Sequence, residues 1–202
     1  QYGLELPIRT VGDYLKRWGF TPQKPIRKAY EQQPEKVQKW LTEQYPAIRA
    51  RAKRENAEIQ WCDETGFSSE DHRGRGYSPK GVTPVTYGTG SRFSTSMISS
   101  INNQGQMRWM VYKGGMNIEL FIKFLHRLIK DAKRKVFLIV DNLRTHHAKK
   151  VSQWVEKHKD EIELFFLPAY SPELNPDEYV NNDVKTNVKA RPSPRSQQEL
   201  QN

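Results

Sequence analysis

The sequence has a single cysteine, Cys62, and no hydrophobic run long enough to cross a membrane. One cysteine excludes a disulfide within the chain and any zinc site built from several cysteines, so a reducing compartment suits the protein best. A membrane-spanning helix needs about 20 consecutive apolar residues, and a secretory signal peptide opens with a basic and then an apolar stretch; neither pattern is present. We therefore expect a cytoplasmic protein with no membrane partner.

Acidic residues are also fewer than basic ones. The 202 residues include 33 Lys and Arg against 23 Asp and Glu, which gives a formal net charge of +10 and an isoelectric point near 9.6. A protein this basic usually binds a polyanion, and nucleic acid is the first candidate; the alternative is a charge excess that only keeps the chain soluble. Hydrophobic residues make up 36% of the chain, enough for a core despite a mean hydropathy of -0.86.

The first 56 residues predict basic helices rather than a sheet. Segment 10–20 repeats apolar residues at helical spacing and ends its pattern at Gly19. A Pro- and Lys-rich linker follows over 21–28, and 34–56 predicts one or two amphipathic helices. The chain begins with Gln rather than Met, and we expect it to be a piece of a longer protein.

From residue 57 onward the pattern changes to strands alternating with helices. AEIQWCDE (57–64) alternates its side chains between two faces, as a strand does, and 92–115 predicts two strands joined by a tight turn at Asn103-Gln104-Gly105. The remaining elements are a helix over 117–135 capped by Asn117, a buried strand over 137–140, a helix near 146–158, a strand over 163–167 and a helix over 177–190. This order predicts an α/β fold with a mixed five-stranded sheet flanked by helices.

Carboxylates stand where these elements are expected to end or begin. Asp63 is expected to close the first strand, Asp141 closes the fourth, and Asp177 and Glu178 open the last helix. If the first and fourth strands are neighbours, Asp63 and Asp141 lie side by side at one edge of the sheet. Two close carboxylates repel each other, and a hard divalent cation such as Mg²⁺ relieves that repulsion. A third carboxylate would complete a site for two cations about 3.5–4 Å apart.

The same acids also have plainer interpretations. Asp141 and Asn142 are good turn residues after a strand. Glu178 falls at the third helical position behind Asn175, where it can close a capping box. Helical spacing even places Asp177, rather than Glu178, on the apolar face of its helix, so the residues alone leave the third acid open.

The histidines next to Asp141 are a weaker signal. His146 and His147 follow the strand end closely, but a His-His pair at a helix start is more often a surface feature. We therefore expect both to be exposed.

Four segments together resemble the bacterial insertion-sequence branch of the mariner superfamily of DDE transposases, which are DDE superfamily endonucleases. They are WCDETGF (61–67), SPKGVTP (78–84), FLIVDNLRTHHA (137–148) and LPAYSPELNPDEYVNNDVK (167–185). TVGDYLKRWGFTPQKP (10–25) is similar to the end of that family's second helix-turn-helix unit and its linker. The combination of VDN with YSPELNPDE is the most specific part of the resemblance.

The resemblance implies an RNase H-like DDE catalytic domain over 57–202. Before it would lie a remnant of a helix-turn-helix DNA-binding region with its linker (1–28) and a helical connector (29–56). Carried over position by position, it implies that Asp63, Asp141 and Glu178 are catalytic and bind Mg²⁺ or Mn²⁺, with two ions per site. Asn142 would support that site, and the role of Asp177 stays open.

The implied activity is metal-dependent DNA cleavage at transposon ends and strand transfer into target DNA. The implied partners are double-stranded DNA and, in synapsis, a second copy of the chain, in the bacterial cytoplasm at the nucleoid. Alternatives are an RNase H-like nuclease without strand transfer and a non-catalytic DNA-binding remnant of a transposase. The resemblance includes neither the family's first helix-turn-helix nor its C-terminal segment, and we expect a fragment with weakened end recognition. The basic residues expected to contact DNA phosphates are Lys24, Arg27, Lys28, Arg73, Arg75, Lys80, Lys149 and Lys150.

Overall fold

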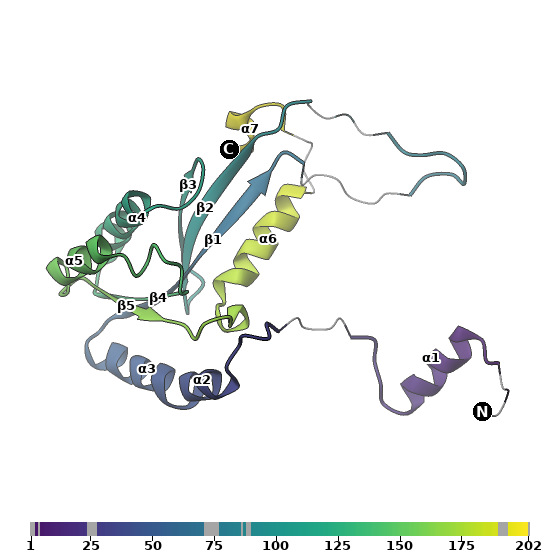
Figure 1. Cartoon of the computed structure of the whole chain (residues 1–202), viewed down its shortest axis with the longest axis horizontal. Helices are drawn as coiled ribbons and strands as arrows, with labels where there is room; N and C mark the ends of the chain where they lie inside the picture. The colour runs from purple at the N-terminus through teal and green to yellow at the C-terminus, as the bar shows by residue number, and fades with distance from the viewer. Residues whose placement is uncertain are drawn as a thin grey trace. The chain divides into compact units, whose positions relative to one another are not determined.

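We describe the protein from a computed structural model, in which residues 3, 5–23, 28–70, 77–85, 87, 90–189 and 194–201 are described (Figure 1). The chain divides into two compact units, Gln1–Tyr30 and Glu31–Asn202. The first unit contains one described helix, α1 (Ile8–Arg17), which confirms the helix expected around 10–20. The helix stops before Gly19, whose φ of +82° belongs to the left-handed region that glycine adopts easily.

The second unit opens with a helical segment that packs on the sheet. It runs from α2 (Pro34–Lys39) through a π-helical turn, η1 (Trp40–Gln44), into α3 (Tyr45–Arg54). Its buried side chains include Trp40 and Ile48, which share one hydrophobic cluster with Trp61 and Ile139 of the sheet. The expected helices over 34–56 are therefore confirmed as one nearly continuous segment, and burial of its apolar side chains holds it against one face of the sheet.

The sheet contains five strands, as the sequence predicted. They are β1 (Glu58–Ser68), β2 (Ser94–Asn102), β3 (Met107–Tyr112), β4 (Val136–Val140) and β5 (Ile162–Phe166), in the spatial order β3-β2-β1-β4-β5. β1 and β2 pair antiparallel, as do β2 and β3, whereas β4 lies parallel to both β1 and β5. The first and fourth strands are therefore neighbours, which is the condition for bringing Asp63 close to Asp141.

One expected boundary is wrong: Asp63 does not close the first strand. Antiparallel pairing with β2 continues as far as Ser68, opposite Ser94, whereas parallel pairing with β4 reaches only Trp61, opposite Ile139. Asp63 therefore lies inside β1, just beyond the point where β4 leaves it. The sequence misled because the apolar alternation stops at Glu64, while the hydrogen bonds to β2 keep the strand extended for several more residues.

The other face of the sheet is covered by α4 (Ile118–Asp131) and α5 (Lys149–Lys157) (Figure 1). Phe121 and Leu125 of α4 are fully buried and share a hydrophobic cluster with Leu138 and Val140 of β4. The predicted cap is confirmed, since the Asn117 side chain accepts a hydrogen bond from the backbone N–H of Leu120 at 2.9 Å. Because helices cover both faces, every residue of β4 is buried, as its unbroken apolar run predicted.

The last large helix, α6 (Asp177–Lys189), follows a short 3-10 turn, η2 (Pro172–Leu174), and runs beside β1 (Figure 1). A further short helix, α7 (Gln197–Gln201), was not expected; the Gln197 side chain donates a hydrogen bond to the backbone oxygen of Ser94 at 2.8 Å. Within the described ranges, no helix is both long and apolar enough to cross a membrane.

Candidate active site

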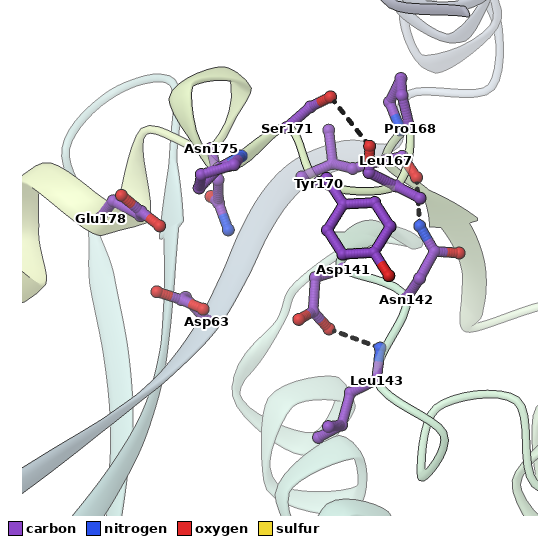
Figure 2. A pocket seen from close by; sticks show the side chains of 12 residues that line it. Asp63, Asp141, Asn142, Leu143, Leu167, Pro168, Tyr170, Ser171, Asn175 and Glu178 are labelled. Atoms are coloured by element: carbon purple, nitrogen blue, oxygen red, sulfur yellow. Dashed lines mark hydrogen bonds between the residues drawn. The ribbon is translucent and has the colours of Figure 1, made fainter. Parts of the chain in front are cut away.

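A cavity of about 440 Å³ opens where β4 ends beside β1 (Figure 2). Three acids from three elements line it: Asp63 within β1, Asp141 directly after β4, and Glu178 in the first turn of α6. Figure 2 shows their carboxylates around the same space. The remaining lining residues are Asn142, Leu143, Leu167, Pro168, Ala169, Tyr170, Ser171, Pro172 and Asn175.

Asp63 is partly buried, and one of its two oxygens is already occupied. The Asn181 side-chain amide of α6 donates a hydrogen bond to Asp63 Oδ2 at 2.9 Å. Burial, with the negative charges of Glu64 and Glu178 nearby, raises the pKa of Asp63 from 3.8 to about 6. The site therefore holds more negative charge than its surroundings neutralise, which is the condition that a cation relieves.

Asp141 is held through its other oxygen, Oδ1. The backbone N–H of Leu143 donates to Oδ1 at 3.0 Å, and His146 Nδ1 lies 3.0 Å from the same atom. Partial burial opposes ionisation, but the hydrogen bonds from His146 and Leu143 prevail and lower the pKa of Asp141 below its usual value. Both protein contacts fall on one oxygen, so Asp141 stays ionised in a fixed orientation.

The expectation that His146 is a surface residue is wrong. Its side chain is only 1% exposed, and its Nε2 lies 3.0 Å from Glu64 Oε1 on β1. Burial by itself disfavours the charged ring, but hydrogen bonds to Asp141 and Glu64 raise the pKa of His146 to about 9. The ring is therefore protonated at neutral pH. Among the described residues, Glu64, Asp141 and His146 form a group whose possible ligand atoms all lie within 4.8 Å of one another.

The structure distinguishes Asp177 from Glu178 at the start of α6, where the sequence alone left the third acid of the site open. Asp177 is fully buried and its Oδ2 accepts a hydrogen bond from the Ser99 hydroxyl at 2.7 Å, whereas Glu178 lines the cavity. Burial, together with the nearby charge of Asp63, raises the pKa of Asp177 to about 7. Asp177 Oδ1 has no hydrogen-bond partner among the described residues.

Asn175 anchors this helix start to the sheet. Its side-chain oxygen accepts from the backbone N–H of Asp177 at 3.1 Å, and its side-chain nitrogen donates to the backbone oxygen of Cys62 at 2.9 Å. The cap that the sequence predicted for α6 is thus also a tie to β1, one residue before Asp63. This tie fixes the first turn of α6, and Glu178 with it, against β1.

Asn142, the expected supporting residue, links the two parallel strands behind the cavity. Its side-chain nitrogen donates to the backbone oxygen of Leu167, just after β5, at 2.5 Å. Its side-chain oxygen lies 3.1 Å from His147 Nε2, and the His147 ring stacks on Phe166 with centroids 4.2 Å apart. His147 is exposed, as expected, and this group holds the loop that carries Asp141.

The cavity wall also contains a residue with an unusual backbone conformation. Tyr170 has a φ of +57°, which is uncommon for a residue other than glycine. The Gln32 side chain donates to the backbone oxygen of Tyr170 at 3.0 Å, so this turn is tied to the segment before α2. The Tyr170 side chain stays 59% exposed at the cavity.

The basic residues expected to contact DNA are placed only in part. Lys28, Lys80, Lys149 and Lys150 are exposed, and the last two begin α5. None of these four lines the cavity of the three acids. The other expected contacts, Lys24, Arg27, Arg73 and Arg75, lie outside the described residues.

Sequence reasoning missed the contacts that hold the acids: Asn181 donates to Asp63, and Ser99 donates to Asp177. Glu64 and Asn181 lie within the motifs at 61–67 and 167–185 but were given no role there, and Ser99 lies in no motif. One sequence signal pointed to His146: a histidine five residues after Asp141 can return to it through a single turn. The structure contains that turn, because the backbone N–H of His146 donates to the backbone oxygen of Leu143 at 2.9 Å.

Comparison with known protein families identifies the class of protein to which this chain belongs. The chain belongs to the DDE superfamily endonuclease family, whose model matches residues 58–201. A winged helix-turn-helix model matches residues 1–44. No curated protein sequence gives a match. The resemblance drawn from the motifs is therefore confirmed at the level of the family.

Solved structures of Mos1 transposase share the fold. The Mos1 strand transfer complex has a TM-score of 0.64 and 20% identity over 96% of this chain and 59% of that chain. The Mos1 mariner paired-end complex with Mn has a TM-score of 0.65 and 18% identity over 96% and 60%. The Mos1 catalytic domain has a TM-score of 0.54 and 16% identity over 89% and 81%. The expected RNase H-like fold is confirmed, and the chain spans about 60% of the length of the chains in the Mos1 complexes.

Proposed function

We propose that this chain carries the catalytic core of a DDE transposase, which cuts DNA at transposon ends and joins the freed ends to target DNA. The observation that carries the proposal is the meeting of Asp63, Asp141 and Glu178, from three separate elements, around one cavity. We assign these three acids as the catalytic, metal-binding residues and Asn142 as their support. Family membership supports the reaction class.

The donor set fits a divalent cation. Mg²⁺ and Mn²⁺ prefer oxygen ligands, and all three side chains are carboxylates. Asn181 occupies Asp63 Oδ2, and Leu143 and His146 occupy Asp141 Oδ1, so the other oxygen of each acid is left for a ligand. The raised pKa of Asp63, about 6, reflects burial and unneutralised neighbouring charge, which a cation would relieve. We further propose that the site binds two ions.

The protein's own contribution to catalysis would be to keep the three carboxylates ionised and correctly oriented before DNA binds. A bound divalent cation would stabilise the negative charge that develops on phosphate oxygens. Asp63, Asp141 and Glu178 would hold it, and they come from elements whose packing is fixed by the buried sheet. The protonated ring of His146 keeps Asp141 ionised, and Asn142 ties the loop that carries it to the end of β5.

Double-stranded DNA is the proposed partner, both as transposon end and as target. The net charge of +10 and the winged helix-turn-helix match at 1–44 support binding to a polyanion. Known Mos1 structures include a paired-end complex and a strand transfer complex, which supports a homodimer in synapsis. We propose 1–28 and 29–56 as DNA-binding remnant and connector, 57–202 as catalytic domain, and the bacterial nucleoid as the place of action. The proposed phosphate contacts are Lys24, Arg27, Lys28, Arg73, Arg75, Lys80, Lys149 and Lys150.

The test is a cleavage assay on labelled duplexes that carry the DNA bordering the coding sequence, with Mg²⁺ or Mn²⁺ and with EDTA. We expect metal-dependent cleavage that Asp63→Asn and Asp141→Asn each abolish without weakening DNA binding. Glu156→Gln, an exposed acid of α5 outside the site, is the matched control and should cleave normally.

Three other results would contradict the proposal in different ways. Equal cleavage of an unrelated duplex without joined products would indicate a nuclease without strand transfer. Binding of DNA that ignores metal, with no cleavage, would indicate a non-catalytic remnant. Unchanged cleavage in both aspartate variants would remove the assigned site.

A further inference from the structure

We propose that Glu64 and His146 act as a positioning pair that fixes Asp141, so that one chosen oxygen of Asp141 faces the metal site. The inference rests on the proposed function, because it gives this pair a role toward the metal that Asp141 would hold. Neither residue lines the cavity, and neither is assigned as a metal ligand.

His146 is held on both ring nitrogens and on one face. Nε2 lies 3.0 Å from Glu64 Oε1, and Nδ1 lies 3.0 Å from Asp141 Oδ1 and 3.3 Å from the backbone oxygen of Asp141. The ring packs against Phe121 of α4 with centroids 4.3 Å apart, and Phe121 is itself fully buried. With the side chain of His146 only 1% exposed, the ring has no room to turn toward solvent.

The consequence for Asp141 is an unequal use of its two oxygens. Oδ1 accepts a hydrogen bond from the backbone N–H of Leu143 at 3.0 Å and lies 3.0 Å from His146 Nδ1. No described residue donates a hydrogen bond to Oδ2, although Asp141 lines the cavity and its side chain is 50% exposed. A carboxylate fixed through one oxygen presents the other in a single direction. Side chains that fix a metal ligand in this way commonly contribute a factor of about 10–100 to metal affinity or activity.

The position of Glu64 explains why the arrangement is rigid. Glu64 follows Asp63 directly on β1, and successive side chains of a strand point to opposite faces. One strand therefore supplies an acid of the cavity and, on its other face, the anchor for the acid on the neighbouring strand. The position of Asp141 relative to Asp63 therefore depends on β1, because Glu64 of β1 contacts His146 and His146 contacts Asp141. Glu64 itself is only 17% exposed.

The first measurement concerns the metal-free protein. The ring ¹⁵N shifts of His146 report on the hydrogen bond at each ring nitrogen. We expect both nitrogens to be hydrogen-bonded in the wild type and the Nε2 signal to change in Glu64→Gln. A ring nitrogen without a hydrogen bond in the wild type would overturn the pair without any assumption about metal.

The second measurement is calorimetric titration with Mn²⁺ in the presence of a random-sequence duplex. His146→Phe keeps the ring volume and its contact with Phe121 but removes both donors, and we expect the Mn²⁺ dissociation constant to rise about 10–100-fold. His146→Asn retains a donor near the Nδ1 position and should lose less. Glu64→Gln, which changes a partly exposed side chain without changing its size, keeps the test valid if His146→Phe folds poorly. His126→Gln, a histidine of α4 away from the site, is the control and should bind Mn²⁺ normally.

Cleavage then separates positioning from a purely structural role. Positioning predicts that the Mn²⁺ concentration for half-maximal cleavage rises with the dissociation constant, while the rate at saturating Mn²⁺ recovers to within several-fold of the wild type. A loss of rate at every Mn²⁺ concentration, together with a lower melting temperature, would overturn it.

Failure of this inference and failure of the proposed function give different results. If the wild type binds Mn²⁺ and Asp141→Asn does not, but His146→Phe and Glu64→Gln bind normally, the positioning pair is overturned and the proposed function stands. If the wild type binds no Mn²⁺ with the duplex present, both are overturned.

Discussion

Replacing Asp177 by asparagine should make the stability of the protein less dependent on pH as the pH rises from about 5 to about 8. Asp177 is fully buried next to Asp63, and its pKa is raised from 3.8 to about 7. In the unfolded chain the same carboxyl ionises near its ordinary value, so the folded state binds the proton more tightly. A carboxyl of this kind contributes most to stability below the unfolded pKa, and the contribution is lost as pH rises to the folded pKa.

The size of the effect follows from that interval. Each pH unit between the two pKa values costs about 1.36 kcal/mol of unfolding free energy. Of the interval between about pH 5 and about pH 8, about two pH units lie below the folded pKa. Over this interval the ionisation of Asp177 should lower the unfolding free energy of the wild type by about 3 kcal/mol. The neutral amide of Asp177→Asn does not ionise, and its oxygen can still accept from the Ser99 hydroxyl. As the pH rises over this interval, the unfolding free energy of the variant should therefore increase by about 2–3 kcal/mol relative to that of the wild type.

The assay is urea unfolding in EDTA at a series of pH values, followed by far-ultraviolet circular dichroism. Asp183→Asn is the matched control, because Asp183 is exposed on the same helix and should leave the pH dependence unchanged. A stability difference between Asp177→Asn and the wild type that stays constant across the series would refute the claim that Asp177 is buried and protonated.

Three further changes test other parts of the structure. Asn181→Ala removes the donor to Asp63 Oδ2 and should slow cleavage about 10–100-fold at unchanged DNA affinity, measured at saturating duplex; an unaffected rate would contradict a role for this contact. Leu138→Ala empties a fully buried position of β4 and should cost about 2–5 kcal/mol in urea unfolding; a smaller loss would mean that the site collapses around the cavity. Exchanging Lys149 and Lys150 together for Gln should weaken DNA binding on any sequence and lower the salt slope by about 2, as measured by fluorescence anisotropy; an unchanged slope would exclude phosphate contacts there.

The fold was largely predictable because its signals are local. The apolar run of β4 and the Asn117 cap each follow from a few neighbouring residues. The order of strands and helices then leaves few topologies, and the mixed sheet is among them. The end of β1 was not predictable, because the hydrogen bonds that extend it past Asp63 come from β2, about 30 residues away in the chain.

The sequence allowed the candidate acids of the site to be identified, but not the contacts that bury or orient them. Asp141 could be identified from its position after a buried strand, but Asp177 and Glu178 could not be ranked from helix geometry alone. Their difference arises from the burial of Asp177 against Ser99 of β2, a contact between distant segments. His146 was misjudged for a related reason: its partner Glu64 and its packing surface Phe121 come from elements that the local sequence does not reveal.

The most direct test of the central claim is the anomalous diffraction of a crystal of this chain grown with Mn²⁺ and duplex DNA. The account predicts an anomalous peak in the cavity, with Mn²⁺ bound by carboxylate oxygens of Asp63, Asp141 and Glu178 and with Asp141 Oδ1 still held by His146. A peak between Glu64, Asp141 and His146 would move the metal to the buried cluster and contradict the assignment. No peak at either place would contradict a metal site in this chain.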